Sequence, residues 1–341
     1  MICGLLNLDK PSGPTSHDMV SRVRRCLGVR QVGHAGTLDP MATGVLVIGV
    51  GPATRLMTFL GDQPKEYAAR IRLGLTTDTE DITGNILAEA SAAGVTQADL
   101  IEALHRFEGP IFQTPPMVSA LKVNGRRLYE LAREGKSVER QPRAVTVYEL
   151  ELLDFAPGNA AEATLRIRCS GGFYVRTLCA DLGRALGCGG CMKALRRTAV
   201  GEFRVEDAVT PEALDDAGAA ALQPASRALA HRPVVILSEE QRQRVLNGGW
   251  IEVSELSPEI PSPGDPEKDS HTQKGSSDKI VRLEDRGGAL IAVARARAID
   301  AGARYDHHCS HDGGYSYDHQ IRWRCDPYIV LGAPGTEPDR C

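Results

Sequence analysis

The stretch His34–Gly44, HAGTLDPMATG, and the apolar run VLVIGV at residues 45–50 that follows it decide how this chain is expected to fold. The apolar run predicts a buried β-strand, and two glycines relax the backbone of the loop before it. Pro40 forces Asp39 toward extended geometry, so the loop presents one carboxylate beside a rigid sheet. Catalytic groups concentrate on such loops, which makes Asp39 the leading active-site candidate. A plain turn or helix cap is the alternative for an Asp-Pro pair.

The composition is that of an ordinary soluble protein. The chain has 341 residues, of which 42% are hydrophobic and 25% charged, so it can bury a sizeable core. No apolar run approaches the roughly 20 residues of a membrane span, and the first residues lack a basic region followed by an apolar signal core. We therefore expect a cytoplasmic protein. The nine cysteines show no framework spacing, so disulfides are not expected.

The charge is unevenly distributed between the two parts of the chain. Residues 1–204 carry 25 Lys and Arg against 21 Asp and Glu, whereas residues 205–341 carry 15 against 23. The net charge of −4 argues against a wholly basic nucleic-acid binder. The arginines of the first part are clustered, however, and together they permit a track for a polyanion. These clusters, each of which could also be a solvated helix face, are Arg22 to Arg30, Arg126-Arg127 and Arg196-Arg197.

The first 204 residues read as strands and helices joined by short glycine-rich connections. Strands are predicted at 66–73, 142–155 and 163–169, and helices from Ser16 to Gly28, from Thr96 to Phe107, around Leu128 and Leu131, and from Gly171-Gly172 onward. In the strand at 66–73, clean alternation places Tyr67 on the apolar face. Many strands without strict βαβ repetition predict an α+β domain with a mixed, mainly antiparallel sheet flanked by helices.

The character of the chain changes after about residue 232. Short strands at 234–237, 279–283 and 289–294 are enough for a small β domain, whereas Ser254–Asp278 has too little apolar surface to offset its ordering entropy. We expect that insertion to be disordered. The last forty residues carry several His and Cys at spacings that match no closed tetrahedral site, which favours a polar, poorly ordered tail. These residues are His307, His308, Cys309, His311, His319 and Cys325. Cys188-Gly-Gly-Cys191 likewise lacks a second pair.

Several motifs, in one order along the chain, resemble those of the TruB family of tRNA pseudouridine synthases. They are GLLNLDKP at residues 4–11, SHD at 16–18, VGHAGTLDPMATG at 32–44, KEY at 65–67, GFYVRT at 172–177 and LRR at 195–197. The segments at 73–84 and 115–122 are similar to the bacterial branch, which modifies uridine 55 in the T loop of tRNA. The resemblance is strong over residues 4–205 and thins sharply after residue 230.

The resemblance implies a catalytic domain with the pseudouridine-synthase fold at 1–232 and a small, degenerate PUA-like β domain at 233–341. The second domain would contain a disordered insertion at about 254–278 and a polar tail. It implies isomerisation of uridine on a flipped-out base, because C1′ and C5 cannot be reached inside folded RNA. Nothing is oxidised and no group leaves, so no metal or cofactor is implied. The expected partner is the T-stem loop of tRNA; we expect a monomer with no obligatory protein partner.

The resemblance also assigns roles to particular residues. Asp39 is the nucleophile, and the carboxylate can attack C1′, add at C6 or assist elimination to a glycal. A fixed cation should keep it charged in a dry pocket, and Arg176 can hold it with both ends of its planar fork. Tyr67 stacks on the base and helps to move a proton. The substrate-binding set comprises His34, Tyr174, Leu195 and, as support, Lys10.

Two other classes of function are compatible with parts of this pattern. A non-catalytic tRNA-binding or folding module could keep the fold, although Asp39, Tyr67 and Arg176 together argue against it. A hydrolytic nucleosidase or glycosidase would need a second carboxylate or a metal to activate water. Asp9 and Asp81 are the carboxylates that could be proposed for that role, and no motif supports either of them persuasively.

Overall fold

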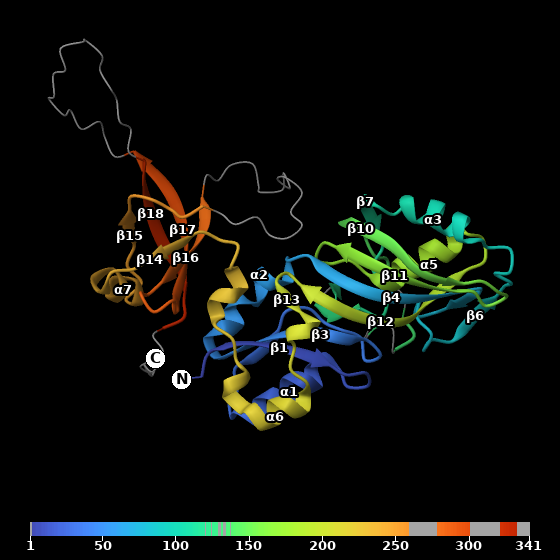
Figure 1. The fold of residues 1–341 in the computed structure, drawn as a ribbon, viewed down its shortest axis with the longest axis horizontal. Coiled ribbons are helices and arrows are strands. Elements are labelled where there is room, and N and C mark those ends of the chain that lie inside the picture. Colours follow the sequence, from blue (N-terminus) through green and yellow to red (C-terminus); the bar gives the residue numbers. More distant parts are fainter. Residues whose placement is uncertain are drawn as a thin grey trace, which may run out of the picture. The chain divides into compact units, whose positions relative to one another are not determined.

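The fold is organised around a nine-stranded sheet and a separate five-stranded sheet (Figure 1). The computed structural model describes residues 2–119, 121–123, 125–128, 131, 134–136, 138–258, 278–300 and 321–332. The strands of the large sheet are β1 (Gly4–Lys10), β2 (Val32–His34), β3 (Thr43–Val50), β4 (Lys65–Leu73), β7 (Gly109–Gln113), β10 (Arg143–Ala156), β11 (Glu162–Cys169), β12 (Gly190–Val200) and β13 (Phe203–Arg204). Two small hairpins pair β5 (Leu75–Thr77) with β6 (Ile86–Glu89) and β8 (Lys122–Val123) with β9 (Arg126–Arg127).

The large sheet is mixed and mainly antiparallel, as the sequence predicts. Its main path runs β1-β3-β12-β4-β11-β10-β7; β12 pairs with β3 in parallel, and the pairs β12–β4, β4–β11, β11–β10 and β10–β7 are antiparallel. The accompanying helices are α1 (Ser16–Leu27), η1 (Gly51–Leu56), α2 (Met57–Gly61), α3 (Gln97–His105), α5 (Val175–Ala185), η2 (Val205–Asp207), α6 (Pro211–Ala217), η3 (Gly218–Ala221) and η4 (Ala225–Leu229). The predicted α+β class is confirmed.

The Asp39 loop leads into β3, which lies between β1 and β12 in this sheet. Residues 44–50 of β3 are all buried, because the strand lies between two others and is covered on both faces. Strand β4 alternates as predicted, with Tyr67, Ala69 and Ile71 buried on one face. The side chain opposite Tyr67 across the β12–β4 ladder is Arg197, which brings the Leu-Arg-Arg segment to the same place.

Helices α1 and α5 differ from the sequence predictions at their N-termini. Thr15, rather than Ser16, is the N-cap of α1, in a capping box with Asp18; Ser16 is buried and its hydroxyl donates to the Leu38 carbonyl at 3.1 Å. Ser16 therefore holds the segment that leads to Asp39. Helix α5 begins at Val175, three residues after Gly172, whose φ of +79° is left-handed rather than helical.

Contacts divide the chain into two units, each with its own internal packing. One comprises Leu6–Ile48 and Met57–Ala221, and the other comprises Met1–Leu5, Gly49–Leu56 and Leu222–Cys341. The second unit contains the five-stranded sheet, in the order β14-β16-β17-β18-β15. Its elements are β14 (Val234–Ile236), α7 (Glu239–Leu246), β15 (Ile251–Val253), β16 (Lys279–Glu284), β17 (Leu290–Asp300) and β18 (Ile321–Val330).

Strand β18 corrects one prediction about the C-terminus. It lies within the last forty residues, and Cys325 on it is fully buried in the apolar core of the small sheet. The prediction of a polar tail is therefore wrong for these ten residues, because pairing with β17 and β15 provides a core that their own pattern did not reveal. The other His and Cys of the predicted tail, most of the insertion at 254–278 and part of the helix around Leu128 and Leu131 lie outside the described residues.

Candidate active site

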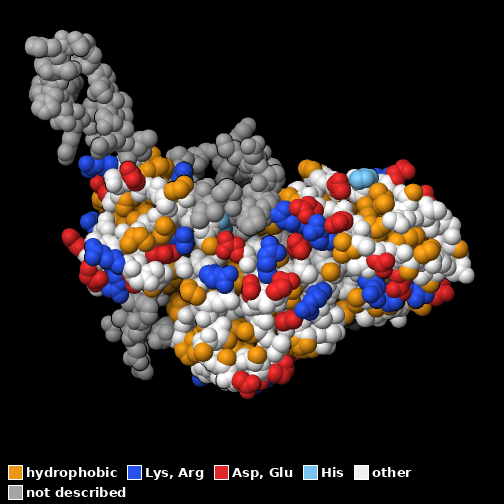
Figure 2. All heavy atoms as spheres, in the orientation of Figure 1, with side chains coloured by type: hydrophobic (Ala, Val, Ile, Leu, Met, Phe, Trp, Pro, Cys, Tyr) orange, Lys and Arg blue, Asp and Glu red, His pale blue; other side chains and the backbone are white. Residues whose placement is uncertain are grey.

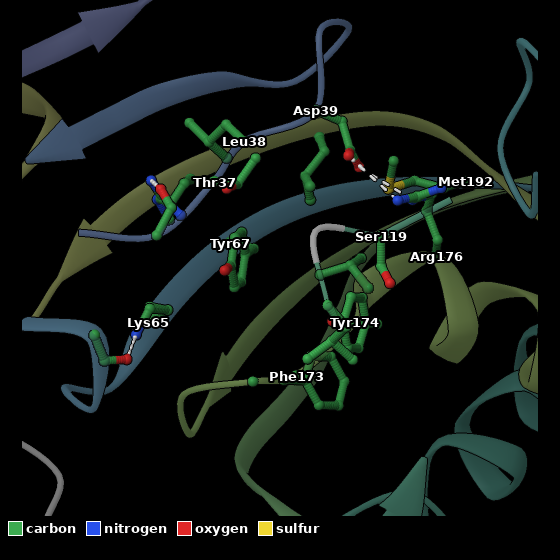
Figure 3. A pocket seen from close by; sticks show the side chains of 17 residues that line it. Thr37, Leu38, Asp39, Lys65, Tyr67, Ser119, Phe173, Tyr174, Arg176 and Met192 are labelled. Carbon is green, nitrogen blue, oxygen red and sulfur yellow. Dashed lines mark hydrogen bonds and ion pairs between the residues drawn. The ribbon is translucent and has the colours of Figure 1, made fainter. Parts of the chain in front are cut away.

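A cavity of about 330 Å³ opens beside Asp39 in the larger unit (Figure 3). Its volume lies at the lower end of the range for small-molecule pockets, roughly 300 to 1,000 Å³. In this view Asp39 and Arg176 occupy one end, Lys65 lies at the other, and the ring of Tyr67 stands between them. Apolar and aromatic side chains complete the wall, among them Leu38, Phe173, Tyr174, Met192 and Leu195.

The backbone around Asp39 is held by Lys10, the last residue of β1. Its side chain is fully buried and its ammonium donates to three carbonyls, those of Pro11 at 2.9 Å, Pro40 at 3.2 Å and Ala42 at 2.7 Å. Two of these carbonyls follow Asp39 in the loop. Burial lowers the pKa of Lys10 to about 8, although the charge of Asp39 opposes this change. Lys10 thus fixes the loop and does not line the cavity, which fits the supporting position that the sequence assigns to it.

Arg176 grips the Asp39 carboxylate at two points. Its Nε lies 3.0 Å from Oδ2 and its Nη2 donates to Oδ1 at 3.2 Å, so the two groups meet in the fork-to-fork arrangement that the sequence predicts. The guanidinium is 5% exposed and the carboxylate side chain 31%, so the acid lies where the cavity meets solvent. The predicted contact is confirmed; the role of each residue in catalysis stays a prediction.

The guanidinium of Arg176 is itself fixed by backbone carbonyls. Nη1 donates to Thr79 O at 3.1 Å and Nη2 donates to Val118 O at 2.7 Å. Arg176 is the second residue of α5, where the helix dipole disfavours a cation, so these contacts must compensate for an unfavourable position. The buried amide of Gln113 on β7 also bonds both backbone groups of Tyr174, which has no side-chain cap of its own.

Asp81 is a second carboxylate beside the same guanidinium. Its Oδ2 lies 3.6 Å from Arg176 Nη1, and its side chain is 8% exposed. The hydroxyls of Thr79 and Thr83 donate to Oδ1, together with the Thr83 N–H, so the carboxylate is held in a turn. Glu80 in this turn has a φ of +62°, which is uncommon for a residue other than glycine and indicates that the surroundings impose the conformation.

The pKa of Asp39 is raised above its ordinary value. Burial is the largest cause, and the neighbouring charge of Asp81 adds to it. The charges of Arg176 and Lys10 favour the ionised form and oppose the rise without cancelling it. Arg176 thus favours the charged form of Asp39 as expected, but burial and Asp81 leave the pKa above its ordinary value, and the carboxylate side chain is 31% exposed rather than enclosed.

Tyr67, Leu195 and Arg197 form one continuous part of the cavity wall. They lie on the paired strands β4 and β12, with Leu195 opposite Ala69 and Arg197 opposite Tyr67. The Tyr67 side chain is buried and burial raises its pKa to about 12, against the charge and hydrogen bond of the Arg197 guanidinium. Tyr67 is therefore a neutral phenol at neutral pH, with its ring available to a base in the cavity.

The structure gathers most, but not all, of the predicted site residues. The cavity is lined by Asp39, Tyr67, Tyr174, Arg176 and Leu195, whereas His34 at the end of β2 is half-buried and does not belong to the lining. Three further charged residues lie in or beside the site: Lys65, which had no assigned role, Asp81, which was considered only as a water-activating carboxylate, and Arg197, which was considered only as a phosphate contact. Alternate residues of a strand share a face, so the position of Arg197 two residues after Leu195 was a signal that both lie in one wall. Nothing in the local sequence of Asp81 indicated that it lies beside Arg176.

Most of the clustered arginines are engaged within the protein. Arg22 pairs with Asp215 at 2.6 Å and Glu212 at 3.2 Å, Arg196 pairs with Asp9 at 2.8 Å, and Arg126 pairs with Glu134. Arg197 is 1% exposed, so its suggested role as a surface phosphate contact is wrong. On the face shown in Figure 2, acidic side chains are interspersed with the basic ones. Arg25 and Arg30 are exposed beside a shallow hollow after α1 and stay candidates for phosphate contact.

No group of three or more His, Cys, Asp or Glu side chains among the described residues is arranged to hold a metal ion. None of the helices in the described ranges is both long enough and apolar enough to cross a membrane.

Solved structures with the same architecture place this chain among pseudouridine-synthase folds. A chain of a crystal structure of a Cbf5-Nop10-Gar1 complex matches with a TM-score of 0.65 at 26% identity, covering 96% of this chain and 84% of that chain. A chain of an H/ACA RNP bound to a substrate RNA containing 2′-deoxyuridine matches with the same TM-score at 24% identity, which supports the fold alone. It covers 97% of this chain and 85% of the other.

Sequence comparisons define the family. The model of the N-terminal domain of TruB family pseudouridylate synthases matches residues 24–175, and that of the tRNA pseudouridylate synthase B C-terminal domain matches residues 176–232. A tRNA pseudouridine synthase B of Symbiobacterium thermophilum is 51% identical over 72% of this chain and 82% of its own length. One from Moorella thermoacetica is 44% identical over 89% and 97% respectively. The chain belongs to the TruB family of pseudouridylate synthases.

Proposed function

We propose that this protein converts uridine 55 in the T loop of tRNA to pseudouridine and that Asp39 is the nucleophile. The observation that carries the proposal is the two-point contact between Asp39 and Arg176 at one end of a cavity beside Tyr67 and Leu195. Relatives named tRNA pseudouridine synthase B, up to 51% identical to this chain, support tRNA as the substrate. A tRNA substrate also agrees with the cytoplasmic location expected from the sequence.

The proposed chemistry needs no co-reactant. The bond between N1 and C1′ of the nucleotide breaks, the base turns, and a bond between C5 and C1′ forms. C5 loses its proton and N1 gains one, so the product is an isomer of the substrate. Attack on C1′, addition at C6 and elimination to a glycal all require the ionised carboxylate at the same place.

The arrangement of the cavity is suited to an extruded base. A base that leaves its stack loses contacts, which an aromatic ring on one side and an apolar side chain on the other can replace. Tyr67 and Leu195 provide such a pair on neighbouring strands. The Arg176 guanidinium holds the carboxylate in one orientation, so less ordering is needed when substrate binds. We propose that the protein acts on tRNA as a monomer, without an obligatory protein partner.

A non-catalytic tRNA-binding module is the competing proposal. Such a module has no need for a buried guanidinium that makes four polar contacts, two of them to a single partly exposed carboxylate. Burying an arginine costs free energy, and a site that only bound RNA would direct its cations at phosphates instead.

The test uses an unmodified tRNA transcript and the purified full-length chain. Chemical mapping is expected to show pseudouridine at uridine 55 and at no other position, and a transcript with cytidine at 55 is the control. Asp39→Asn is expected to abolish product while the Kd for tRNA stays within a few fold, because the carboxylate contributes to chemistry more than to affinity. Equal loss of binding and turnover would contradict the role of Asp39, and product at another uridine would contradict the proposed target.

A further inference from the structure

Arg197 is a buried cation with no carboxylate partner among the described residues. It is 1% exposed and is among the largest fully buried side chains of the protein. Burying an unpaired charge is costly, so the guanidinium must obtain compensation from neutral oxygen atoms. The pairing of Asp39 with Arg176 does not explain why a second buried cation is kept in the wall of the same cavity.

Arg197 is hydrogen-bonded to the segment that carries Asp39 and lies opposite Tyr67 in the sheet. Nε donates to Val45 O at 2.7 Å and Nη2 donates to Gly36 O at 3.2 Å, which are the carbonyls on either side of the loop. Across the β12–β4 ladder Arg197 is paired with Tyr67, and its guanidinium lowers the pKa of the phenol. In Figure 3 the hydroxyl of Tyr67 is directed away from Asp39, and the side chain stands in the wall of the cavity.

Gly36 leaves room for this arrangement. Its φ is +102°, and a Cβ built on it would lie 3.6 Å from Arg197 Nη1 and 3.9 Å from Lys65 Cε. The two cationic side chains therefore lie under the same turn. Lys65 donates to Gly61 O at 2.6 Å and Gln63 O at 2.8 Å, so its ammonium is engaged away from the Asp39 loop.

We propose that Arg197 is a positioning residue that fixes the Tyr67 ring relative to the Asp39 loop during the isomerisation. The proposal rests on the proposed function, since the fixed distance matters only if a base is held between the two residues. Together with Lys10 and Arg176, Arg197 makes a set of three buried cations. Arg197 binds the Asp39 loop at its start, Lys10 binds it after Asp39, and Arg176 binds the carboxylate itself.

The same guanidinium acts on the phenol electrostatically. Burial raises the pKa of Tyr67, and Asp39 and the Cys169 thiol act in the same direction, whereas Arg197 lowers it. The charge of Lys65 faces both Arg197 and Cys169. Removal of the guanidinium is therefore expected to raise the pKa of Tyr67 further and to release the orientation of its hydroxyl.

The experiment compares Arg197→Met, Arg197→Lys, Tyr67→Phe and the double variant Arg197→Met with Tyr67→Phe. Release of tritium from tRNA labelled at C5 of uridine, with enzyme in excess, measures the single-turnover rate constant. Arg70→Met is the matched control, because Arg70 lies on β4 and is exposed. Fluorotyrosine placed at position 67, titrated by ¹⁹F NMR without RNA, reports the phenol directly.

Arg197→Met is expected to lower the single-turnover rate about 10- to 100-fold, the size expected when one charged donor is lost from the Asp39 loop, with the Kd for tRNA within threefold. The double variant should be no more than threefold slower than the slower single variant, because both disrupt one contact. Arg197→Lys should recover part of the rate. The fluorophenol pKa should rise in Arg197→Met and stay unchanged in Arg70→Met.

Three results would overturn the proposal. The first is a rate for Arg197→Met within threefold of wild type. The second is a double variant in which the rate losses of the two single substitutions multiply. The third is a fluorophenol titration that is unchanged in Arg197→Met. If Arg197→Met does not fold, a folded Arg197→Lys that turns over at the wild-type rate is equally decisive. If the unsubstituted chain releases no tritium, the proposed function fails, and the ¹⁹F titration still decides whether Arg197 controls Tyr67.

Discussion

Replacement of Arg176 by lysine tests whether the site needs the two-point grip or only a positive charge. Arg176 makes four polar contacts within 3.2 Å, at 3.0 and 3.2 Å to Asp39, 3.1 Å to Thr79 O and 2.7 Å to Val118 O. A lysine ammonium is a single point and can maintain one contact to the carboxylate. The second contact is lost, and Asp39 becomes free to rotate about the remaining one.

The expected loss of rate follows from that second contact. A hydrogen bond to a charged group contributes about 1.5–3 kcal/mol. If all of it stabilises the transition state, the single-turnover rate of Arg176→Lys falls roughly 10- to 100-fold, at 1.36 kcal/mol for each factor of ten. The affinity for tRNA should change little, because Arg176 is buried behind the carboxylate rather than exposed to phosphates.

The same substitution should also lower stability. It leaves Thr79 O and Val118 O without their donor, and an unsatisfied buried carbonyl costs about 1–3 kcal/mol. We therefore expect the free energy of unfolding to fall by about 2–6 kcal/mol, measured as a shift of the urea midpoint at unchanged m-value. Arg176→Met is the matched comparison, since it removes the charge as well and should be slower than Arg176→Lys.

The assay is tritium release from C5-labelled tRNA with enzyme in excess. It is run at a pH where roughly 90% or more of each variant is folded. Arg176→Lys within threefold of the wild-type rate would refute the reasoning, because a single-point contact would then suffice. A rate for Arg176→Met equal to that of Arg176→Lys would refute the further statement that the charge contributes.

Two remaining predictions concern the surroundings of the site. Asp81→Asn removes a negative charge that raises the pKa of Asp39, so the acid limb of the pH–rate profile, where the reactive carboxylate becomes protonated, should move to lower pH. Asp78→Asn in the same turn should leave that limb in place, and an unmoved limb in both variants would contradict the assignment. Gly44→Ala should lower the free energy of unfolding by about 3–5 kcal/mol, because its Cβ would lie 2.1 Å from Arg197 O at a φ of +101°. Gly13→Ala has a similar φ of +108° with nothing within 4 Å, so an equal loss in both variants, measured by urea unfolding, would show that the close approach is unimportant.

Local sequence was sufficient wherever the determining contacts are local. The alternation of β4 and the apolar run of β3 predict those strands correctly, because a period of two and a continuous apolar run are direct consequences of which faces are buried. Thr96 caps α3 as predicted through its bond with Asp99, three residues away. The end of α1 at Gly28, with a φ of +65°, follows from the same kind of short-range rule.

The order of the motifs also predicted the meeting of Asp39 and Arg176, although no local rule connects residues 137 positions apart. The prediction of that contact came from the resemblance to the family, while Asp39 itself was indicated by its loop. Helix capping failed where a tertiary contact competes for the side chain: Ser16, a good cap by type, bonds Leu38 instead, and Thr15 takes the cap. The strand at 321–330 was missed because its core is supplied by strands distant in sequence.

The sequence by itself therefore determined many of the elements, the class of fold and the carboxylate that we propose as nucleophile, because those depend on periodicity, turn residues and side-chain type. Only the tertiary structure decided that Arg197 is buried opposite Tyr67 rather than exposed to solvent, and that Asp81 shares the guanidinium of Arg176. The physical reason is that the environment of an arginine or aspartate, and hence its charge state and partners, depends on which distant strands pack around it.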